Sequence, residues 1–137
     1  MDCFICDGKT SVVNSRPQLR LKQVWRRRLC KNCGYIFTTI EKIDLERSMM
    51  VKFNNQHLEE FVREKILISI RDSLGHHKDP INDSIAITDT IISKLYKNNQ
   101  SPLIDRNNIV KTTLEVLKHF DKASYIHYQA YHKLNEL

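Results

Sequence analysis

The sequence has 137 residues, of which 41% are hydrophobic and 28% are charged, and its formal net charge is +6. This length suits one domain or two small ones, and the balanced composition argues against a disordered or fibrous protein. No apolar run approaches the roughly 20 residues that are needed to cross a bilayer. The N-terminus also lacks the basic and then apolar pattern of a secretory signal. We therefore expect a soluble, cytoplasmic protein with no membrane partner.

The positive charge is concentrated near the N-terminus. Residues 1–40 contain eight basic and two acidic residues, whereas residues 41–137 contain 14 of each sign. All four cysteines also lie within the first 40 residues. This division predicts two modules, a basic one at residues 1–46 and an electrically neutral one at residues 47–137.

Two cysteine pairs, each with two intervening residues, indicate a metal site. The residues are Cys3, Cys6, Cys30 and Cys33. In an intracellular chain, this arrangement suits one structural Zn²⁺ held by four thiolates better than two disulfides. Gly8 and Gly34 lie beside the pairs, where a zinc knuckle tends to need a positive φ. The alternative is a redox pair or four unrelated thiols, but so small a module has too little core to fold without a cross-link.

Three β-prone segments accompany the cysteines and predict a three-stranded zinc ribbon. They cover residues 11–16 (ended by Pro17), 19–29 and 35–40. The middle segment alternates with period 2, and one of its faces presents four cations. That face consists of Arg20, Lys22, Val24, Arg26 and Arg28. Trp25 lies on the other face, where we expect it to join the small core rather than stack on a base.

The cationic face favours binding to nucleic acid. Lysine and arginine attract phosphate backbones, and arginine also reads guanine edges through two parallel hydrogen bonds. The alternative is a solvated strand face, which normally mixes both signs of charge. Here no acidic residue falls between Lys9 and Glu41.

The second module has the pattern of a β-hairpin followed by about four helices, so the fold class is α+β. A strand at residues 49–53 leads into an Asn54-Asn55 turn, and a short second strand precedes Glu59. Helices are expected at residues 59–74, 84–96, 105–120 and 122–134, the last capped by Asp121. His76 and His77 lie in a polar loop, where solvated histidines are more common than metal ligands. No catalytic constellation is present, so we expect a protein that is not an enzyme.

Several short motifs of the first module occur together. They are Cys3-x2-Cys6, Val12-Val13-Asn14-Ser15-Arg16, Arg26-Arg27-Arg28 ahead of Cys30-x2-Cys33-Gly34, and Phe37-Thr38-Thr39. With these motifs, the chain resembles the NrdR-type transcriptional repressors of ribonucleotide reductase genes, which join a zinc ribbon to an ATP-cone. The resemblance implies that the ribbon binds operator boxes in double-stranded DNA upstream of reductase genes. The DNA contacts that it implies are Arg16, Arg26, Arg27 and Arg28, and the cationic face adds Arg20 and Lys22.

The ATP-cone motifs are only partly kept. Val51-Lys52-Phe53-Asn54-Asn55 retains the Val, Lys and Asn of the family's hairpin, but Phe53 replaces an arginine and Asn55 replaces a glycine. Glu59-x-Phe61-x3-Lys65 fits with one extra hairpin residue, and Tyr125-Ile126-His127-Tyr128 resembles the family's Y-V-R-F. The residues implied to bind ATP or dATP are Val51, Lys52, Asn54, Glu59, Lys65 and Tyr125. Phenylalanine cannot make the charge-assisted bonds of arginine, so its presence is expected to weaken or redirect nucleotide binding.

The resemblance implies a repressor that forms homo-oligomers, whose size depends on the bound ATP or dATP and decides which DNA boxes are occupied. Two other classes remain open. One is a zinc-ribbon adaptor for RNA polymerase or another protein, with a cone that no longer binds nucleotide. The other is an enzyme subunit, since ATP-cones also regulate reductases, but the chain is too short to include a reductase barrel.

Overall fold

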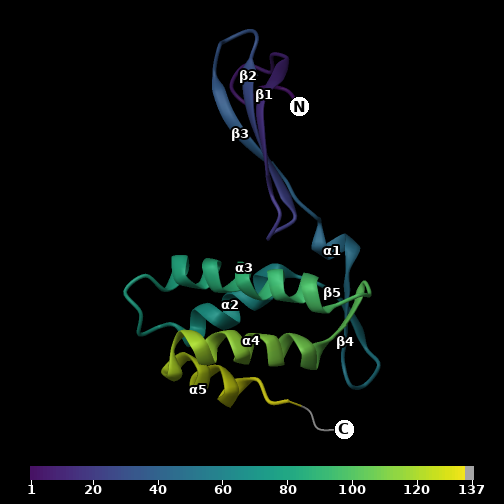
Figure 1. Cartoon of the computed structure of the whole chain (residues 1–137), viewed down its shortest axis with the longest axis vertical. Coiled ribbons are helices and arrows are strands. Elements are labelled where there is room, and N and C mark those ends of the chain that lie inside the picture. The colour runs from purple at the N-terminus through teal and green to yellow at the C-terminus, as the bar shows by residue number, and fades with distance from the viewer. Residues whose placement is uncertain (135–137) are drawn as a thin grey trace. The chain divides into compact units, whose positions relative to one another are not determined.

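The chain forms two compact units, Met1–Ile43 and Asp44–Leu137, in a computed structural model that describes residues 1–134 (Figure 1). The last three residues of the expected second module, 135–137, lie outside the described range. The first unit is a three-stranded sheet that carries the four cysteines, and the second is mainly helical with a small sheet. The expected α+β fold is thus confirmed. No helix within residues 1–134 is long and apolar enough to cross a membrane.

The sheet of the first unit is antiparallel, in the order β1-β2-β3. Its strands are β1 (Thr10–Gln18), β2 (Gln23–Cys30) and β3 (Ile36–Glu41). Pro17 does not end the first strand as expected, but pairs with Val24. Proline is tolerated there because β1 lies at the edge of the sheet, where only one side of the strand is paired.

The second strand is shorter than the alternating pattern predicts. Residues 19–22 form the turn between β1 and β2, and Lys22 has a φ of 50°. Arg20 and Lys22 therefore lie in the turn and not on a strand face, which corrects the expected four-cation stripe. An alternating pattern does not show where a chain reverses direction, since turn residues can continue it by chance.

The second unit begins with a short helix that the sequence pattern did not predict. In chain order its elements are α1 (Leu45–Ser48), β4 (Met50–Lys52), β5 (Leu58–Glu60), α2 (Arg63–Ser73), α3 (Pro80–Asn98), β6 (Leu103–Asp105), α4 (Arg106–Phe120) and α5 (Lys122–Tyr131). Strand β4 is central, antiparallel to β5 and parallel to β6. Strand β6 was also not predicted, because three residues are too few to show a period.

Local interactions explain where the helices begin. Helix α2 starts after residue 62 rather than at Glu59 because Leu58–Glu60 pairs with β4 instead. Helix α3 starts at Pro80, earlier than expected, since Asp79 accepts a hydrogen bond from the Asn82 backbone and proline suits the first turn. Asp121 caps α5 as expected, by accepting from the backbone N–H of Ser124.

The hydrophobic core lies wholly within the second unit, where α2 packs against α3 and α5, and α4 packs against the same two helices (Figure 1). Its buried members are Val51, Phe61, Ile70, Leu74, Ile87, Ile91, Ile92, Leu95, Ile104, Val110, Leu114, Leu117 and Tyr128. In the first unit, the buried hydrophobic residues are Cys3 and Cys30. Trp25 is 42% exposed, so its expected place in a core is wrong. A single small sheet has no second layer that could cover it.

Candidate functional sites

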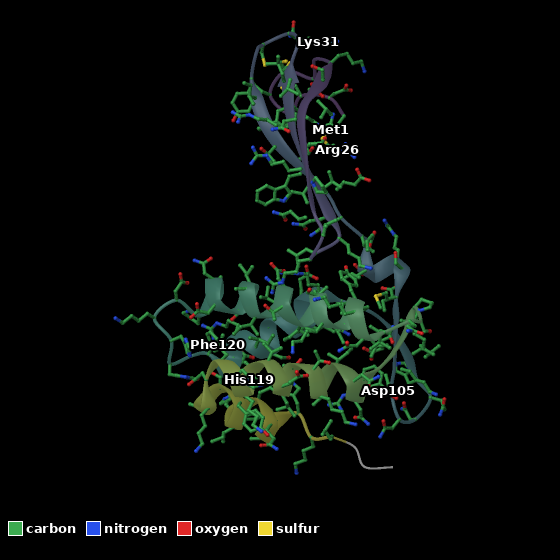
Figure 2. All side chains as sticks on the ribbon, in the orientation of Figure 1. Met1, Arg26, Lys31, Asp105, His119 and Phe120 are labelled. Atoms are coloured by element: carbon green, nitrogen blue, oxygen red, sulfur yellow. The ribbon has the colours of Figure 1, made fainter. Side chains whose placement is uncertain are left out.

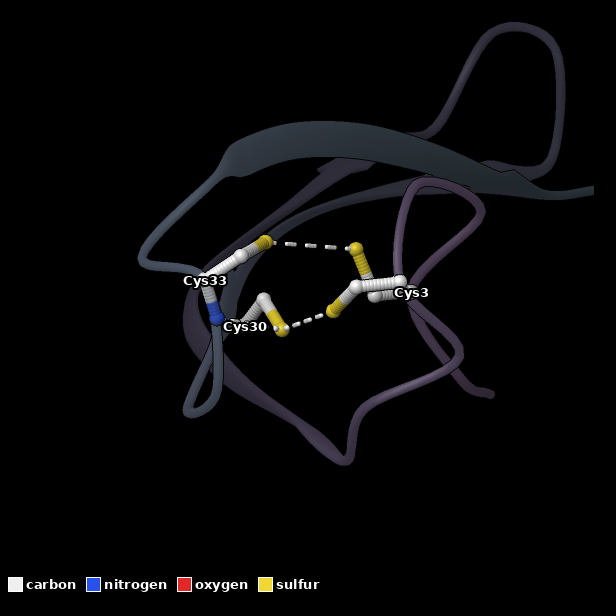
Figure 3. Close-up of side chains that lie close together, drawn as sticks. Cys3, Cys30 and Cys33 are labelled. Carbon is white, nitrogen blue, oxygen red and sulfur yellow. Dashed lines mark hydrogen bonds between the residues drawn. The ribbon is translucent and has the colours of Figure 1, made fainter.

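The fold brings the four cysteines together at one end of the ribbon (Figure 3). The sulfur atoms of Cys3 and Cys33 lie 3.8 Å apart, and those of Cys6 and Cys30 lie 3.5 Å apart. Tetrahedral zinc with Zn–S bonds of about 2.3 Å separates its sulfur ligands by about 3.8 Å. The thiols are free rather than disulfide-bonded. The spacing therefore fits a tetrahedral metal site, and zinc bound there would join the two cysteine pairs.

Backbone geometry shapes both knuckles. The backbone N–H groups of Asn32 and Cys33 point at the Cys30 sulfur, at 3.4 and 3.5 Å. Gly34 has the expected positive φ of 73°. In the first knuckle, however, the positive φ belongs to Asp7 and not to Gly8. Gly8 is needed for space, since a Cβ there would lie 2.6 Å from the Cβ of Asn32.

A hydrogen bond from Asn32 favours the thiolate form of Cys6. Its side-chain amide donates to the Cys6 sulfur at 3.5 Å, and this bond, followed by one from the Gly8 backbone, lowers the pKa of Cys6 to about 6. A thiolate is the form that binds metal, so this environment favours the ligand state. The sequence pattern gave no sign of Asn32 because the contact depends on how the two knuckles meet.

The arginines on one face of β2 form ion pairs or hydrogen bonds with neighbouring side chains. On one face, Arg26 is paired with Glu41 at 2.8 Å and also donates to Ser15. Arg28 on the same face donates to Thr39 at 3.1 Å. Arg26, labelled in Figure 2, is thus partly neutralised by its own sheet.

The opposite face of the sheet is basic, aromatic and exposed. Arg16 on β1 is the cross-strand neighbour of Trp25 on β2, and Arg27 lies two residues along the same face. The side chains of all three residues are exposed. This exposed face, defined by Arg16, Trp25 and Arg27, has the character of a nucleic-acid interface, since cations bind phosphates and an aromatic ring stacks on bases.

A pocket in the second unit collects half of the residues that were predicted to bind nucleotide. Val51, Glu59 and Lys65 line it, together with Phe53. The other predicted residues, Lys52, Asn54 and Tyr125, are not among its lining residues. Lys65 is paired with Glu59 at 2.9 Å, and this hydrogen bond is the main cause that lowers the pKa of Glu59.

The pocket also contains side chains that the sequence motifs did not indicate. Arg106, at the start of α4, and Tyr128 and His132, at the end of α5, complete the wall. Arg106 thus places a guanidinium group in the wall of the pocket that Phe53 also lines. Its position follows from the packing of α4 near the small sheet, which no local motif reveals.

Comparison with known proteins agrees with this architecture. Residues 1–41 match the family model described as the N-terminal domain of NrdR-like transcriptional repressors. A protein of Methylacidiphilum infernorum named transcriptional repressor NrdR is 34% identical, over 93% of this chain and 76% of its own length. The chain belongs to the NrdR family of transcriptional repressors.

Other NrdR relatives are similar over nearly the full chain. The transcriptional repressor NrdR of Caldicellulosiruptor bescii is 33% identical over 97% of this chain and 86% of its own. The transcriptional repressor NrdR of Staphylococcus carnosus is 32% identical over 97% of this chain and 84% of its own length. The NrdR family is thus one of transcriptional regulators and not of enzymes, and its zinc ribbon is present here.

Proposed function

We propose that this protein is a zinc-dependent, DNA-binding repressor of ribonucleotide reductase genes, and that ATP or dATP controls it through its oligomeric state. It acts in the cytoplasm, where thiols stay reduced and available to zinc. The observation that carries the proposal is the tetrahedral cysteine cluster on a sheet whose exposed face consists of Arg16, Trp25 and Arg27.

The exposed face is the principal contact with DNA. Arg27 has an exposed side chain and is free to form the forked pair of hydrogen bonds that recognises guanine. Arg16 contacts phosphate from the neighbouring strand, and Trp25 covers a base or sugar. Arg20 and Lys22 in the turn add phosphate contacts. Arg26 and Arg28 contribute less, since they must first exchange bonds to Glu41 and Thr39.

Duplex binding by matched arginine variants tests this assignment. Arg27→Ala should weaken binding to reductase-promoter DNA by about 5- to 150-fold, because one good base contact contributes about 1–3 kcal/mol. Arg28→Ala serves as the matched control on the opposite face and should cause a smaller loss. Fluorescence anisotropy measures both, and zinc content shows that the ribbon is intact. Equal losses for the two variants would reject the exposed face as the principal contact.

The pocket of the second unit is the site we propose for ATP or dATP. Its apolar wall, which includes Phe53 and Phe61, suits an adenine ring, whereas Lys65 and Arg106 suit the phosphates. When the nucleotide binds, Lys65 gives up its ion pair with Glu59 and pairs with a phosphate group instead. Arg106 takes over the charge-assisted bonds that Phe53 cannot make. Val51, Lys52, Asn54 and Tyr125 remain predicted contacts of the same ligand.

Isothermal titration with ATP and with dATP tests the pocket. Arg106→Ala and Lys65→Ala should each weaken binding by tenfold or more, because a hydrogen bond to a charged group contributes about 1.5–3 kcal/mol. Lys94→Ala is the control, since Lys94 pairs with Glu115 and does not line the pocket. If neither nucleotide produces heat with the wild type, the second unit is structural only.

Nucleotide binding controls DNA binding only if one oligomer binds the nucleotide better than another. The segment 41–137 has equal numbers of acidic and basic residues, so copies of it can associate without strong repulsion. In such an oligomer, binding of one ribbon to its DNA box would raise the effective concentration of the second ribbon at a neighbouring box. Light scattering after size exclusion should report a mass that changes between the nucleotide-free protein and the protein with ATP or dATP. The same mass in all three states would reject this regulation.

One observation favours the adaptor function as a second candidate. Phe4, Tyr35 and Phe37 form an aromatic cluster beside the cysteines, and Phe4 is 67% exposed. Such an exposed apolar group also occurs at protein-binding surfaces. Strong, sequence-specific duplex affinity that falls steeply with salt supports the repressor, and affinity that is weak and indifferent to sequence supports the adaptor.

A further inference from the structure

Two neighbouring histidines meet a carboxylate at the end of the second unit where α2 leads into α3. His76 Nε2 lies 2.7 Å from Asp121 Oδ2, and His77 Nε2 lies 3.4 Å from the same oxygen. His77 is partly buried and stacks on Phe120, with ring centroids 5.3 Å apart. His76 is exposed, in keeping with the expectation of solvated histidines, whereas the partly buried His77 departs from it. They belong to a cluster that joins two separate turns of the chain.

The cluster holds one ligand atom from each of three residues within 4.8 Å of one another. Two imidazole nitrogens and one carboxylate oxygen are a common ligand set for divalent first-row metals. The ring of His77 is also oriented from behind, since its Nδ1 lies 3.1 Å from Asp83 Oδ2. A carboxylate in that position fixes the tautomer and leaves Nε2 as the metal ligand, as in many metal sites.

The cluster brings several polar atoms to one carboxylate oxygen. Asp121 Oδ2 accepts hydrogen bonds from the backbone N–H and the hydroxyl of Ser124, and it also faces ring nitrogens of His76 and His77. A carboxylate oxygen has about two lone-pair sites. A neutral His77 that donates to Asp83 would also point a lone pair at Asp121. Either a proton on His77 Nε2 or a cation placed between the nitrogens and the carboxylate removes that repulsion.

We propose that His76, His77 and Asp121 form a second metal site, for a divalent first-row ion such as Zn²⁺, with Asp83 orienting His77. The site links the turn between α2 and α3 to the junction of α4 and α5. It lies at the opposite end of α4 from Arg106, and the 15 residues of that helix correspond to about 22 Å. The site is thus separate from the pocket, and it shares no residue with the cysteine cluster of the first unit.

Zinc stoichiometry of the untagged full-length protein tests the site. After equilibrium dialysis against zinc, the wild type should hold a second Zn²⁺ in addition to the one in the ribbon. The His76→Gln/His77→Gln double variant should hold only the ribbon ion. His119→Gln is the matched control, since His119 is exposed and lies outside the cluster, and it should hold both. The Cys30→Ser variant should lose the ribbon zinc and keep the second, which separates this test from that of the repressor function.

Two further variants probe the roles within the cluster. Asp83→Asn should weaken the second zinc about 10–100-fold, the usual effect of removing such an orienting group. Asp121→Asn should weaken it at least as much while keeping α5 capped, because asparagine also caps helices. Zinc should raise the melting temperature of the second unit in the wild type but not in the double variant. The proposal is overturned if the wild type binds no second zinc, or if the double variant binds it equally well.

Discussion

Gly8 and Gly34 serve the two cysteine knuckles for different physical reasons. Gly34 has a φ of 73° and open space around its Cα, so its requirement is conformational. Gly8 has no positive φ, but a side chain there would collide with Asn32 and approach the Cys6 sulfur to 3.1 Å. The sequence predicts that both knuckles need glycine. The folded structure shows that Gly34 is needed for its backbone conformation and Gly8 for lack of space.

Alanine substitutions test this difference. Gly8→Ala should strongly reduce zinc affinity, because the knuckles cannot close around the added methyl group without moving. Gly34→Ala should weaken zinc binding by about 1–2 kcal/mol, because a residue with a Cβ is strained in the left-handed conformation. Competition with a zinc-binding dye measures both.

Gly75→Ala is the matched control for these substitutions. Its added Cβ would meet nothing closer than 3.9 Å, and the cysteine site of this variant should bind zinc as tightly as that of the wild type. A Gly8→Ala variant that keeps wild-type zinc affinity would contradict the crowding argument.

At the scale of elements, the start of helix α3 is set by an N-terminal cap rather than by the spacing of its apolar residues. The apolar pattern indicates a helix from Ser84, but the structure begins it at Pro80. Asp79 accepts from the Asn82 backbone at 3.3 Å and from its side-chain amide at 2.7 Å. The first turn is therefore stabilised by polar contacts that an apolar pattern does not report.

Removing this cap should destabilise the second unit. Asp79→Ala is expected to lower its free energy of unfolding by about 1 kcal/mol, because the first turn loses its side-chain acceptor. Asp79→Asn keeps an acceptor and should stay close to the wild type. Urea unfolding followed by circular dichroism measures the difference, and equal destabilisation by both substitutions would show that charge rather than capping matters.

At the scale of the whole molecule, the two units are stabilised by different means. The second unit has a core of aliphatic and aromatic side chains that includes no residue of the first. The ribbon buries little besides two cysteines, so it depends on the metal. Loss of metal should thus unfold the first unit and leave the second folded on its own core.

Chelation tests this independence. A strong zinc chelator should unfold the ribbon and abolish DNA binding, whereas the helical signal of the second unit should persist. Circular dichroism at the helical minimum, recorded with and without chelator, measures the outcome. Adding zinc back should restore DNA binding. A complete loss of helical signal on chelation would show that the units fold as one.

Much of the ribbon could be predicted because its information is local. The spacing of the cysteine pairs and the β-prone segments between them depend on neighbours in sequence, and these features are also the ones that identified the family. The second unit was less predictable in detail, because β6 pairs with a strand about 50 residues earlier and shows no period of its own. Helix type and approximate position were predictable, whereas the exact ends depended on caps and strand pairing.

The sequence by itself determined the kind of metal ligands, the basic character of the first 40 residues and the family to which the chain belongs. Only the tertiary structure decided which arginines are available, because Arg26 finds Glu41 across the sheet whereas Arg16 and Arg27 stay exposed beside Trp25. It also brought Arg106 to the pocket and Asp121 to the two histidines. Residue types and short spacings are written in the chain, but contacts between distant segments arise when the core packs.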